Sequence, residues 1–107
     1  PPERRAAQAR MINKEFGASE LPRLLAGDFN ATPESEAVAI LKDAWTPTDG
    51  VDAPPTFPSN KPEIKIDYVF FAPQQRWVVK ENRVIENKVA SDHFALLATL
   101  ELIVKVD

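Results

Sequence analysis

The stretch Leu24–Pro33, LLAGDFNATP, decides the fold of this chain. A short apolar run ends at Gly27, and an aspartate and an asparagine then stand on either side of a phenylalanine. In a strand, Asp28 and Asn30 point to one side while Phe29 points to the other. The stretch therefore predicts a buried strand that delivers a carboxylate and a carboxamide to its C-terminal edge. Both residue types are also common in turns and caps, so these residues alone leave a functional site and an ordinary turn open.

Length and composition limit the classes of protein that this chain can belong to. It has 107 residues, 44% of them hydrophobic, which suits one domain with a modest core. The formal net charge of -3 provides no basic field to hold nucleic acid by charge alone. The absence of cysteine excludes disulfides, thiol catalysis and a cysteine-ligated zinc. No apolar run approaches the about 20 residues of a membrane span. Because the chain starts at Pro1 without an initiating Met, we expect a processed protein, an excised domain or a fragment.

Two helices are predicted. Apolar residues recur every three or four positions over Glu3–Phe16, and Gly17 ends this pattern. We interpret the basic residues of this helix as a solvated face: Arg4, Arg5, Arg10 and Lys14. Thr32–Pro33 resembles an N-cap followed by a first helical position, so a second helix is predicted to begin there and to end near Asp43–Trp45.

The remaining segments predict strands and one long loop. A strand is expected over Leu21–Gly27, and Ile64–Phe71, rich in β-branched and aromatic residues, gives the clearest strand signal. Thr46–Pro62 has neither period, so we expect a surface loop that borders a functional site. Trp77–Lys88 is expected to form one strand or two short ones. The near-continuous apolar run Phe94–Val106 predicts a last strand that is buried on both faces.

Five polar residues lie in or beside strands that we expect to share one sheet, so they are predicted to converge at one edge: Asp28, Asn30, Asp67, Asp92 and His93. Each alone has a structural interpretation as a turn residue, a satisfied buried carboxylate or a structural histidine. Together they are the groups that a metal-assisted phosphoester hydrolase requires. Carboxylates suit magnesium or manganese, and an imidazole held by a carboxylate donates hydrogen bonds to a phosphate. Asp67 and His93 are the predicted carboxylate and imidazole pair.

Three motifs carry a resemblance to a known family. They are Gly27–Asn30 (GDFN), Ile66–Phe70 (IDYVF) and Ser91–His93 (SDH). Their order and approximate spacing resemble the C-terminal motifs of the endonuclease/exonuclease/phosphatase superfamily, which includes pancreatic-type deoxyribonucleases, abasic-site endonucleases, inositol polyphosphate 5-phosphatases and neutral sphingomyelinases. Thr56–Pro62 (TFPSNKP) resembles a bacterial branch of metal-dependent hydrolases. Lys65 stands where this branch often has arginine, which puts a bidentate contact there in doubt.

The resemblance implies an α+β fold of the DNase-I-like type. The chain would form one half of a four-layer α/β/β/α sandwich, with a mainly antiparallel or mixed sheet and two helices. Residues 1–107 would be the C-terminal half of a single domain. The absent N-terminal half normally supplies an asparagine and the glutamate that is the principal metal ligand.

The resemblance also implies roles for the five polar residues. Asp28 would position or deprotonate the attacking water or bind a metal, and Asn30 would contact the scissile phosphate. Asp67 would orient His93, which contacts the phosphate. Asp92 would hold a metal or its water. The metal would be Mg²⁺, with Mn²⁺ as a substitute, and this chain would hold an incomplete set of ligands.

The function expected from these residues is metal-dependent phosphoester hydrolysis by a phosphodiesterase, nuclease or phosphatase. The full-length protein would be the active Mg-dependent enzyme, and this chain alone would be inactive or weak. The alternative is a catalytically silent structural or interaction domain that retains the scaffold. A calcium loop that starts at Asp28 is excluded, because its sixth position is Pro33 rather than Gly and its twelfth is Ala39 rather than Glu.

Expected partners follow from the same resemblance. The substrate would be a phosphoester in a small molecule, a lipid headgroup or a nucleic acid, and the acidic balance favours the first two. The missing N-terminal half, or a second copy of the chain, would cover an open sheet face. The compartment stays undecided. A bacterial origin and a secreted or periplasmic full-length protein are expectations of the resemblance alone.

Overall fold

A computed structural model describes residues 1–50 and 53–104 of the chain. The elements in chain order are α1 (Pro2–Phe16), β1 (Arg23–Asp28), α2 (Glu36–Lys42), β2 (Thr46–Pro47), β3 (Asp67–Ala72), the 3-10 helix η1 (Gln74–Arg76), β4 (Trp77–Ile85) and β5 (Ala95–Leu102). Residues 51 and 52 of the predicted loop and Val106, the predicted end of the last strand, lie outside the described residues. None of the described helices is both long and apolar enough to cross a membrane.

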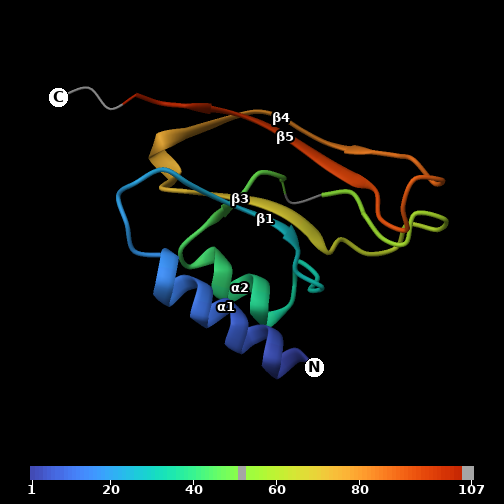
Figure 1. The fold of residues 1–107 in the computed structure, drawn as a ribbon, viewed down its shortest axis with the longest axis horizontal. Helices are drawn as coiled ribbons and strands as arrows, with labels where there is room; N and C mark the ends of the chain where they lie inside the picture. The colour runs from blue at the N-terminus through green and yellow to red at the C-terminus, as the bar shows by residue number, and fades with distance from the viewer. Residues whose placement is uncertain (51–52, 105–107) are drawn as a thin grey trace.

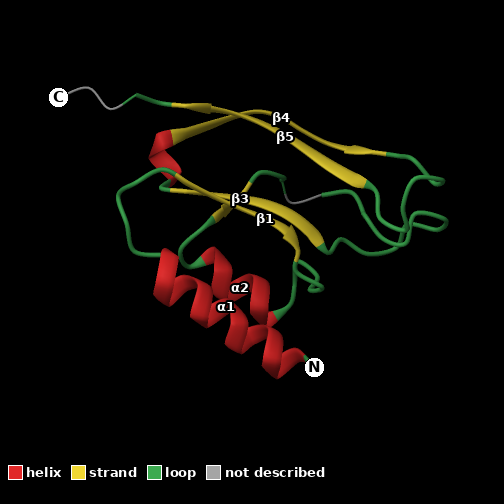
Figure 2. Ribbon diagram, in the orientation of Figure 1, coloured by secondary structure: helices red, strands yellow, loops and turns green. Residues whose placement is uncertain are grey.

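The strands form two antiparallel sheets rather than the single sheet that was expected. In the first sheet β3 lies between β1 and β2, and in the second β4 pairs with β5. Both helices lie side by side on one face of the first sheet, and the β4–β5 hairpin lies on the other side of it (Figures 1 and 2). The expectation of one sheet was wrong because pairing partners cannot be assigned from the pattern of each strand alone.

The hydrophobic core lies between the helices and the first sheet. Tyr68 and Phe70 alternate along β3 and are buried with Val38 and Leu41 of α2. Phe29 packs edge-on against both aromatic rings, with centroid distances of 5.9 Å to Tyr68 and 5.6 Å to Phe70. Phe29 is half-buried, so its packing contributes less than the about 1.5–3 kcal/mol of a fully buried side chain of this size. The end of β1 is thereby anchored, and its polar residues on either side of Phe29 stay at the edge of the sheet.

The start of α2 differs from the prediction. Ser35, rather than Thr32, is the N-cap, and its Oγ accepts a hydrogen bond from the amide of Val38 at 3.3 Å. Thr32 instead closes a turn by accepting a hydrogen bond from the amide of Ser35 at 3.0 Å. Serine is a somewhat better N-cap residue than threonine. Ser35 therefore caps the helix, and α2 begins one turn later than predicted. The helix ends at Lys42, with Asp43 as its C-cap.

The predicted loop and the strand that follows it also differ in detail. Thr46–Pro47 form β2 and pair with Phe71 and Phe70 of β3. Two residues carry no period, so the sequence held no signal for this strand. β3 begins at Asp67, and Ile64 forms an isolated bridge with Phe57.

The last strand is not buried on both faces. Residues of β5 are half-buried or exposed, because the β4–β5 hairpin is an outer layer of the molecule that packs on the first sheet with one side (Figure 1). The segment Trp77–Lys88 forms the single strand β4, which ends at Ile85.

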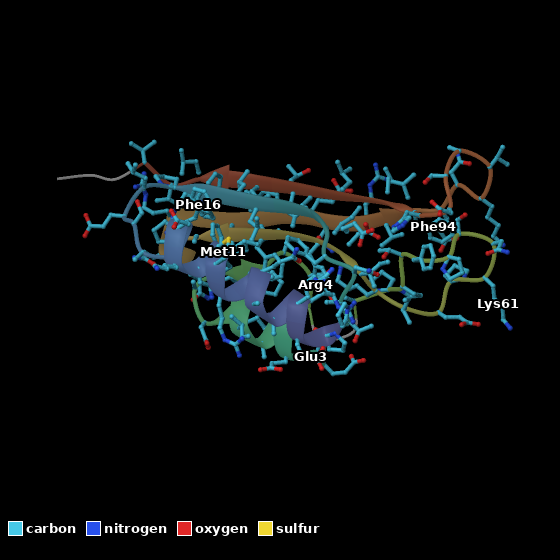
Figure 3. The ribbon with its side chains drawn as sticks, turned by 60° about the horizontal axis from the view of Figure 1, so that its bottom comes forward. Glu3, Arg4, Met11, Phe16, Lys61 and Phe94 are labelled. Carbon is cyan, nitrogen blue, oxygen red and sulfur yellow. The ribbon has the colours of Figure 1, made fainter. Side chains whose placement is uncertain are left out.

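Apolar side chains are exposed elsewhere as well. Met11 and Phe16 of α1 are 66% and 61% exposed, and Figure 3 shows both toward the C-terminal part of this helix. Leu21, just before β1, and Leu24, within it, are 71% and 54% exposed; the prediction of a buried strand was wrong here, since the residues of β1 are half-buried or exposed. Several large apolar groups in neighbouring elements are typical of a surface that makes contacts.

Candidate active site

An imidazole flanked by two carboxylates forms the centre of the candidate site. Nδ1 of His93 lies 2.8 Å from Oδ2 of Asp67, and Nε2 lies 3.7 Å from Oδ2 of Asp28. The two aspartates are partners in the antiparallel register of β1 and β3. His93 comes from the segment that leads into β5. The three residues therefore converge from two sheets, and each offers a ligand atom within 4.8 Å of the others.

The carboxylates control the protonation of the histidine. The hydrogen bond with Asp67 raises the pKa of His93 above its usual value. Burial opposes this shift, and the charges of Asp67, Asp28 and Asp92 each add a smaller upward effect. The side chain is 25% exposed, so it remains accessible. With Nδ1 directed at Asp67, Nε2 is the ring atom that can exchange a proton or donate to an anion.

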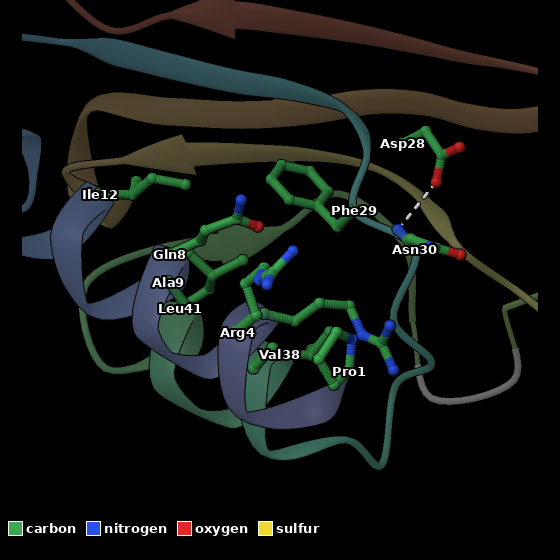
Figure 4. A pocket seen from close by; sticks show the side chains of 12 residues that line it. Pro1, Arg4, Gln8, Ala9, Ile12, Asp28, Phe29, Asn30, Val38 and Leu41 are labelled. Atoms are coloured by element: carbon green, nitrogen blue, oxygen red, sulfur yellow. Dashed lines mark hydrogen bonds between the residues drawn. The ribbon is translucent and has the colours of Figure 1, made fainter.

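Asp28 uses its two oxygens differently. Oδ1 accepts a hydrogen bond from the backbone amide of Asn30 at 2.8 Å, drawn as a dashed line in Figure 4, while Oδ2 faces His93. Asn30 has a φ of 51°, a left-handed conformation that asparagine tolerates better than most residues. The bond to Asp28 holds this turn closed. As a result, the carboxamide of Asn30 stays exposed beside the carboxylate.

The loop before β3 forms part of the wall of the site. The ring of Phe57 lies 4.7 Å from the ring of His93, measured between centroids, with a tilt of 47°. Oγ of Ser59 donates a hydrogen bond to the carbonyl oxygen of Ser91 at 2.6 Å. The backbone amide of Ser59 donates to the carbonyl oxygen of Asp92 at 2.7 Å. The loop thus holds the SDH segment by its backbone and contacts the imidazole directly.

Thr56 connects this loop to both sheets. Its side chain is completely buried, and Oγ1 accepts a hydrogen bond from the amide of Ile66 at 3.2 Å. Its carbonyl oxygen accepts from the amide of Phe94 at 2.8 Å. Figure 3 shows Phe94 close to the loop that carries Lys61. The TFPSNKP segment therefore sets where His93 sits relative to β3.

Asp92 lies apart from the three-residue cluster. Its carboxylate is exposed and accepts a long hydrogen bond of 3.4 Å from Oγ of Ser91. Among the described residues, the group of mutually close ligand atoms contains Asp28, Asp67 and His93 and does not include Asp92. A metal-holding role for Asp92 stays a prediction.

Lys65 forms a buried ion pair behind the site, a structural role that was not predicted from the sequence. Its side chain is 3% exposed and forms an ion pair with Asp49, which is 7% exposed. Nζ also donates to the backbone carbonyl of Asp67 at 2.7 Å and lies 4.4 Å from the centroid of the Tyr68 ring. The signal was a charged residue within an apolar strand segment, since such a group needs a partner when buried. The partner, in the irregular loop, could not be identified from the sequence.

Tyr68 ties the two motif strands together on the buried side. Its hydroxyl donates to the carbonyl oxygen of Ala31 at 2.8 Å. Burial raises the pKa of Tyr68 strongly, and the charges of Asp49, Glu34 and Asp67 add to the effect, so the hydroxyl stays protonated as a donor. The chain just after Asn30 is thereby fixed to β3.

Comparisons with known proteins were made for the whole chain. A family model described as "Endonuclease/Exonuclease/phosphatase family" matches residues 1–93. Among curated proteins, none matches the sequence. The structure of the endonuclease/exonuclease/phosphatase from Bacteroides vulgatus is 26% identical with a TM-score of 0.79, covering 94% of this chain and 45% of that chain. The corresponding protein from Beutenbergia cavernae is 25% identical with a TM-score of 0.76, covering 94% of this chain and 31% of that chain.

A third solved structure supports the fold alone. A functionally unknown conserved protein from Enterococcus faecalis is 24% identical with a TM-score of 0.79, covering 95% of this chain and 46% of that chain. The chain spans less than half the length of each of these three structures. The fold is therefore α+β and DNase-I-like, and it corresponds to a part of the solved domains.

Proposed function

This chain belongs to the endonuclease/exonuclease/phosphatase family, and we propose that it carries the phosphate-contacting part of a metal-dependent phosphoester hydrolase. The family is one of phosphoesterases and nucleases that act on phosphoester substrates. The observation that carries the proposal is His93, held on one ring nitrogen by Asp67 and facing Asp28 with the other. A structural histidine would not need a carboxylate on both sides at a partly exposed edge.

The proposed chemistry assigns one task to each side chain. Asp67 keeps Nδ1 of His93 hydrogen-bonded, so the imidazolium presents Nε2–H to a non-bridging oxygen of the phosphate. Asp28 orients the attacking water and accepts its proton while the new oxygen–phosphorus bond forms and the bond to the leaving group breaks. The exposed carboxamide of Asn30 donates a further hydrogen bond to the phosphate. The 3.7 Å between Nε2 of His93 and Oδ2 of Asp28 is too long for a direct hydrogen bond, so both groups remain available to the substrate and the water.

The donor set fits a hard divalent cation held weakly. Oδ2 of Asp67 is hydrogen-bonded to Nδ1 of His93, so Asp28 would be the first carboxylate to hold Mg²⁺ or Mn²⁺, and Asp92 would be a second ligand from outside the cluster. Mg²⁺ is commonly held by one or two carboxylates and several waters. When bound, the cation would neutralise charge on the phosphate oxygens.

We further propose that residues 1–107 act as the C-terminal half of a single domain and are weak or inactive alone. The support is the partial coverage of the solved relatives and the small number of carboxylates at the site. The remainder of the domain would cover the exposed apolar residues of α1 and β1. A second copy of the chain is the alternative cover.

The test compares the full-length protein and this chain in hydrolysis of bis(p-nitrophenyl) phosphate with Mg²⁺, with Mn²⁺ and with EDTA. We expect metal-dependent turnover in the full-length protein. We also expect His93→Gln to lower kcat by about 10²–10³ while the protein stays folded, as removal of a hydrogen-bond donor to the developing charge does. Glu20→Gln, at an exposed position between α1 and β1, is the control. Turnover that survives His93→Gln would contradict the proposal, and absence of turnover in every full-length preparation would favour a silent scaffold.

A further inference from the structure

A pocket of about 350 Å³ lies beside the candidate site and is not used by the proposed chemistry. It shares Asp28 and Asn30 with the site, and Arg4, Arg5 and Gln8 from the beginning of α1 also line it. Figure 4 shows Arg4 and Gln8 on the helix side of the pocket. Its volume lies in the range of about 300–1,000 Å³ that is typical of small-molecule sites. A group bound there would be adjacent to whatever binds at Asp28.

The charge of this pocket differs from that of the chain. Its lining contains two guanidinium groups and one carboxylate, that of Asp28, whereas the whole chain has a net charge of -3. Arg10, farther along α1, pairs with Glu36 at 3.0 Å. Within the described part of the chain, Arg4 and Arg5 form no such ion pair. Arg4 is exposed and Arg5 half-buried, which agrees with a solvated face, and both also line the pocket.

The lining defines the chemistry of a ligand. Guanidinium groups bind phosphate through two parallel hydrogen bonds, and the carboxamides of Gln8 and Asn30 add neutral donors. The floor is apolar and includes Phe29 and Leu41. This combination suits a phosphate attached to a carbon skeleton.

We propose that the pocket binds a second phosphate group of the substrate while the scissile phosphoester lies at Asp28 and His93. This inference rests on the proposed function and narrows its substrate to phosphoesters that carry two phosphate groups. A lipid headgroup with a single phosphodiester and a cationic end is disfavoured, because it would place its cation against Arg4 and Arg5.

The first experiment measures binding without catalysis. Inorganic pyrophosphate is titrated into the ¹⁵N-labelled chain in EDTA, and the Nε–H signals of the arginines and the amide of Asn30 are followed. We expect Arg4→Gln/Arg5→Gln to weaken binding about tenfold or more, equivalent to roughly 1.4 kcal/mol. Arg83→Gln, which removes a β4 residue paired with Glu81, should leave it unchanged.

Two results would overturn the subsite. One is an unchanged affinity in a double variant whose amide spectrum remains folded. The other is an equal response at all arginines, which would indicate attraction by surface charge only. If the double variant fails to fold, Arg4→Lys/Arg5→Lys keeps the charge but removes the paired donors of each guanidinium, and it should still weaken binding measurably relative to the unchanged chain.

The second experiment separates the subsite from the proposed function. In the full-length protein, dithymidine monophosphate is compared with the same dinucleotide bearing a 5′-phosphate, and both with a sugar bisphosphate. The double glutamine variant should raise KM for the two doubly phosphorylated substrates and leave KM for the plain dinucleotide unchanged. The larger increase identifies the natural substrate as a nucleotide or a sugar phosphate. If the double glutamine variant changes KM equally for both dinucleotides, the subsite is overturned. Persistence of hydrolysis in His93→Gln would instead overturn the proposed function.

Discussion

Nδ1 of His93 lies 2.8 Å from Oδ2 of Asp67, although the two residues are 26 positions apart and belong to segments of different sheets. The contact depends on the loop that carries Thr56 and Phe57, because this loop bonds to the backbone on both sides of it. A substitution of Asp67 should therefore alter the protonation of His93 directly.

Asp67→Asn should lower the pKa of His93 toward its usual value of about 6.5, because the carboxylate contributes the largest upward effect. The ring protons of His93, the single histidine of the chain, report this directly in an NMR titration in EDTA. Asp92→Asn is the matched control and should produce a smaller decrease, since Asp92 is the weakest of the upward contributors. An unchanged or raised pKa in Asp67→Asn would refute the assigned pairing.

The stability of the fold should decrease as pH rises, in a way that depends on His93. Its folded-state pKa is raised, so protonated His93 stabilises the fold. That contribution is fully present below the unfolded value of about 6.5 and is lost as pH rises through the raised folded value. Urea unfolding should show that the stability advantage of the wild-type chain over His93→Gln shrinks across that interval. In an Asp67→Asn background the same comparison should be nearly flat, and an advantage that grows with pH would contradict the sign.

Gly27→Ala should destabilise the chain through backbone strain. Gly27 has a φ of 152°, where an L side chain is strained, yet a Cβ there would meet no atom within 4 Å. The expected loss is about 1–3 kcal/mol, measured by urea unfolding. Gly50→Ala is the control, because a Cβ there is equally free of contacts and no such φ occurs. Equal effects of the two changes would show that strain at Gly27 is not the cause.

Lys65→Met should be strongly destabilising, because it leaves the buried carboxylate of Asp49 without its partner. Loss of one member of a buried pair costs about 3–5 kcal/mol. Lys80→Met removes one member of an exposed pair with Glu101, a type of pair that contributes about 0–1 kcal/mol. Adding Asp49→Leu to Lys65→Met should recover part of the loss, and a double-mutant cycle measures the coupling. A purely additive cycle would contradict a direct pair.

Metal removal should affect the chain and the full-length protein differently. The chain offers few free carboxylates at the site, so Mg²⁺ should shift its unfolding temperature little, whereas EDTA should abolish phosphodiester hydrolysis by the full-length protein. Differential scanning fluorimetry and isothermal titration calorimetry measure the first effect. Tight Mg²⁺ binding by the isolated chain would show that its ligand set is more complete than proposed.

Local signals predicted the elements well where those elements are long. The three-to-four spacing of α1 and the apolar run of IDYVF correspond to α1 and β3, with boundaries shifted by a few residues. Prediction failed where the outcome depended on competition between neighbours, as between Thr32 and Ser35 for the N-cap. Prediction also failed for β2, a strand that is defined by its pairing with the edge of β3.

For the candidate site, residue types and element ends were predictable, whereas partners were not. Asp28 ends β1, and Asn30 lies in the turn that the carboxylate of Asp28 closes, which is a local property. The partner of Lys65 and the position of Arg4 and Arg5 beside Asp28 depend on the packing of separate elements. The pattern of a single helix could not distinguish a solvated arginine from one that lines a pocket.

By itself, the sequence determined that LLAGDFNATP ends a strand in polar groups and that three motifs in order belong to one family, because periodicity and side-chain chemistry are local. Only the tertiary structure decided that His93 reaches Asp67 and Asp28 from a second sheet and that Asp92 stays apart from them. The physical reason is that contacts between distant residues are selected by the packing of whole layers, here by a loop bonded to both sheets, which no short pattern encodes.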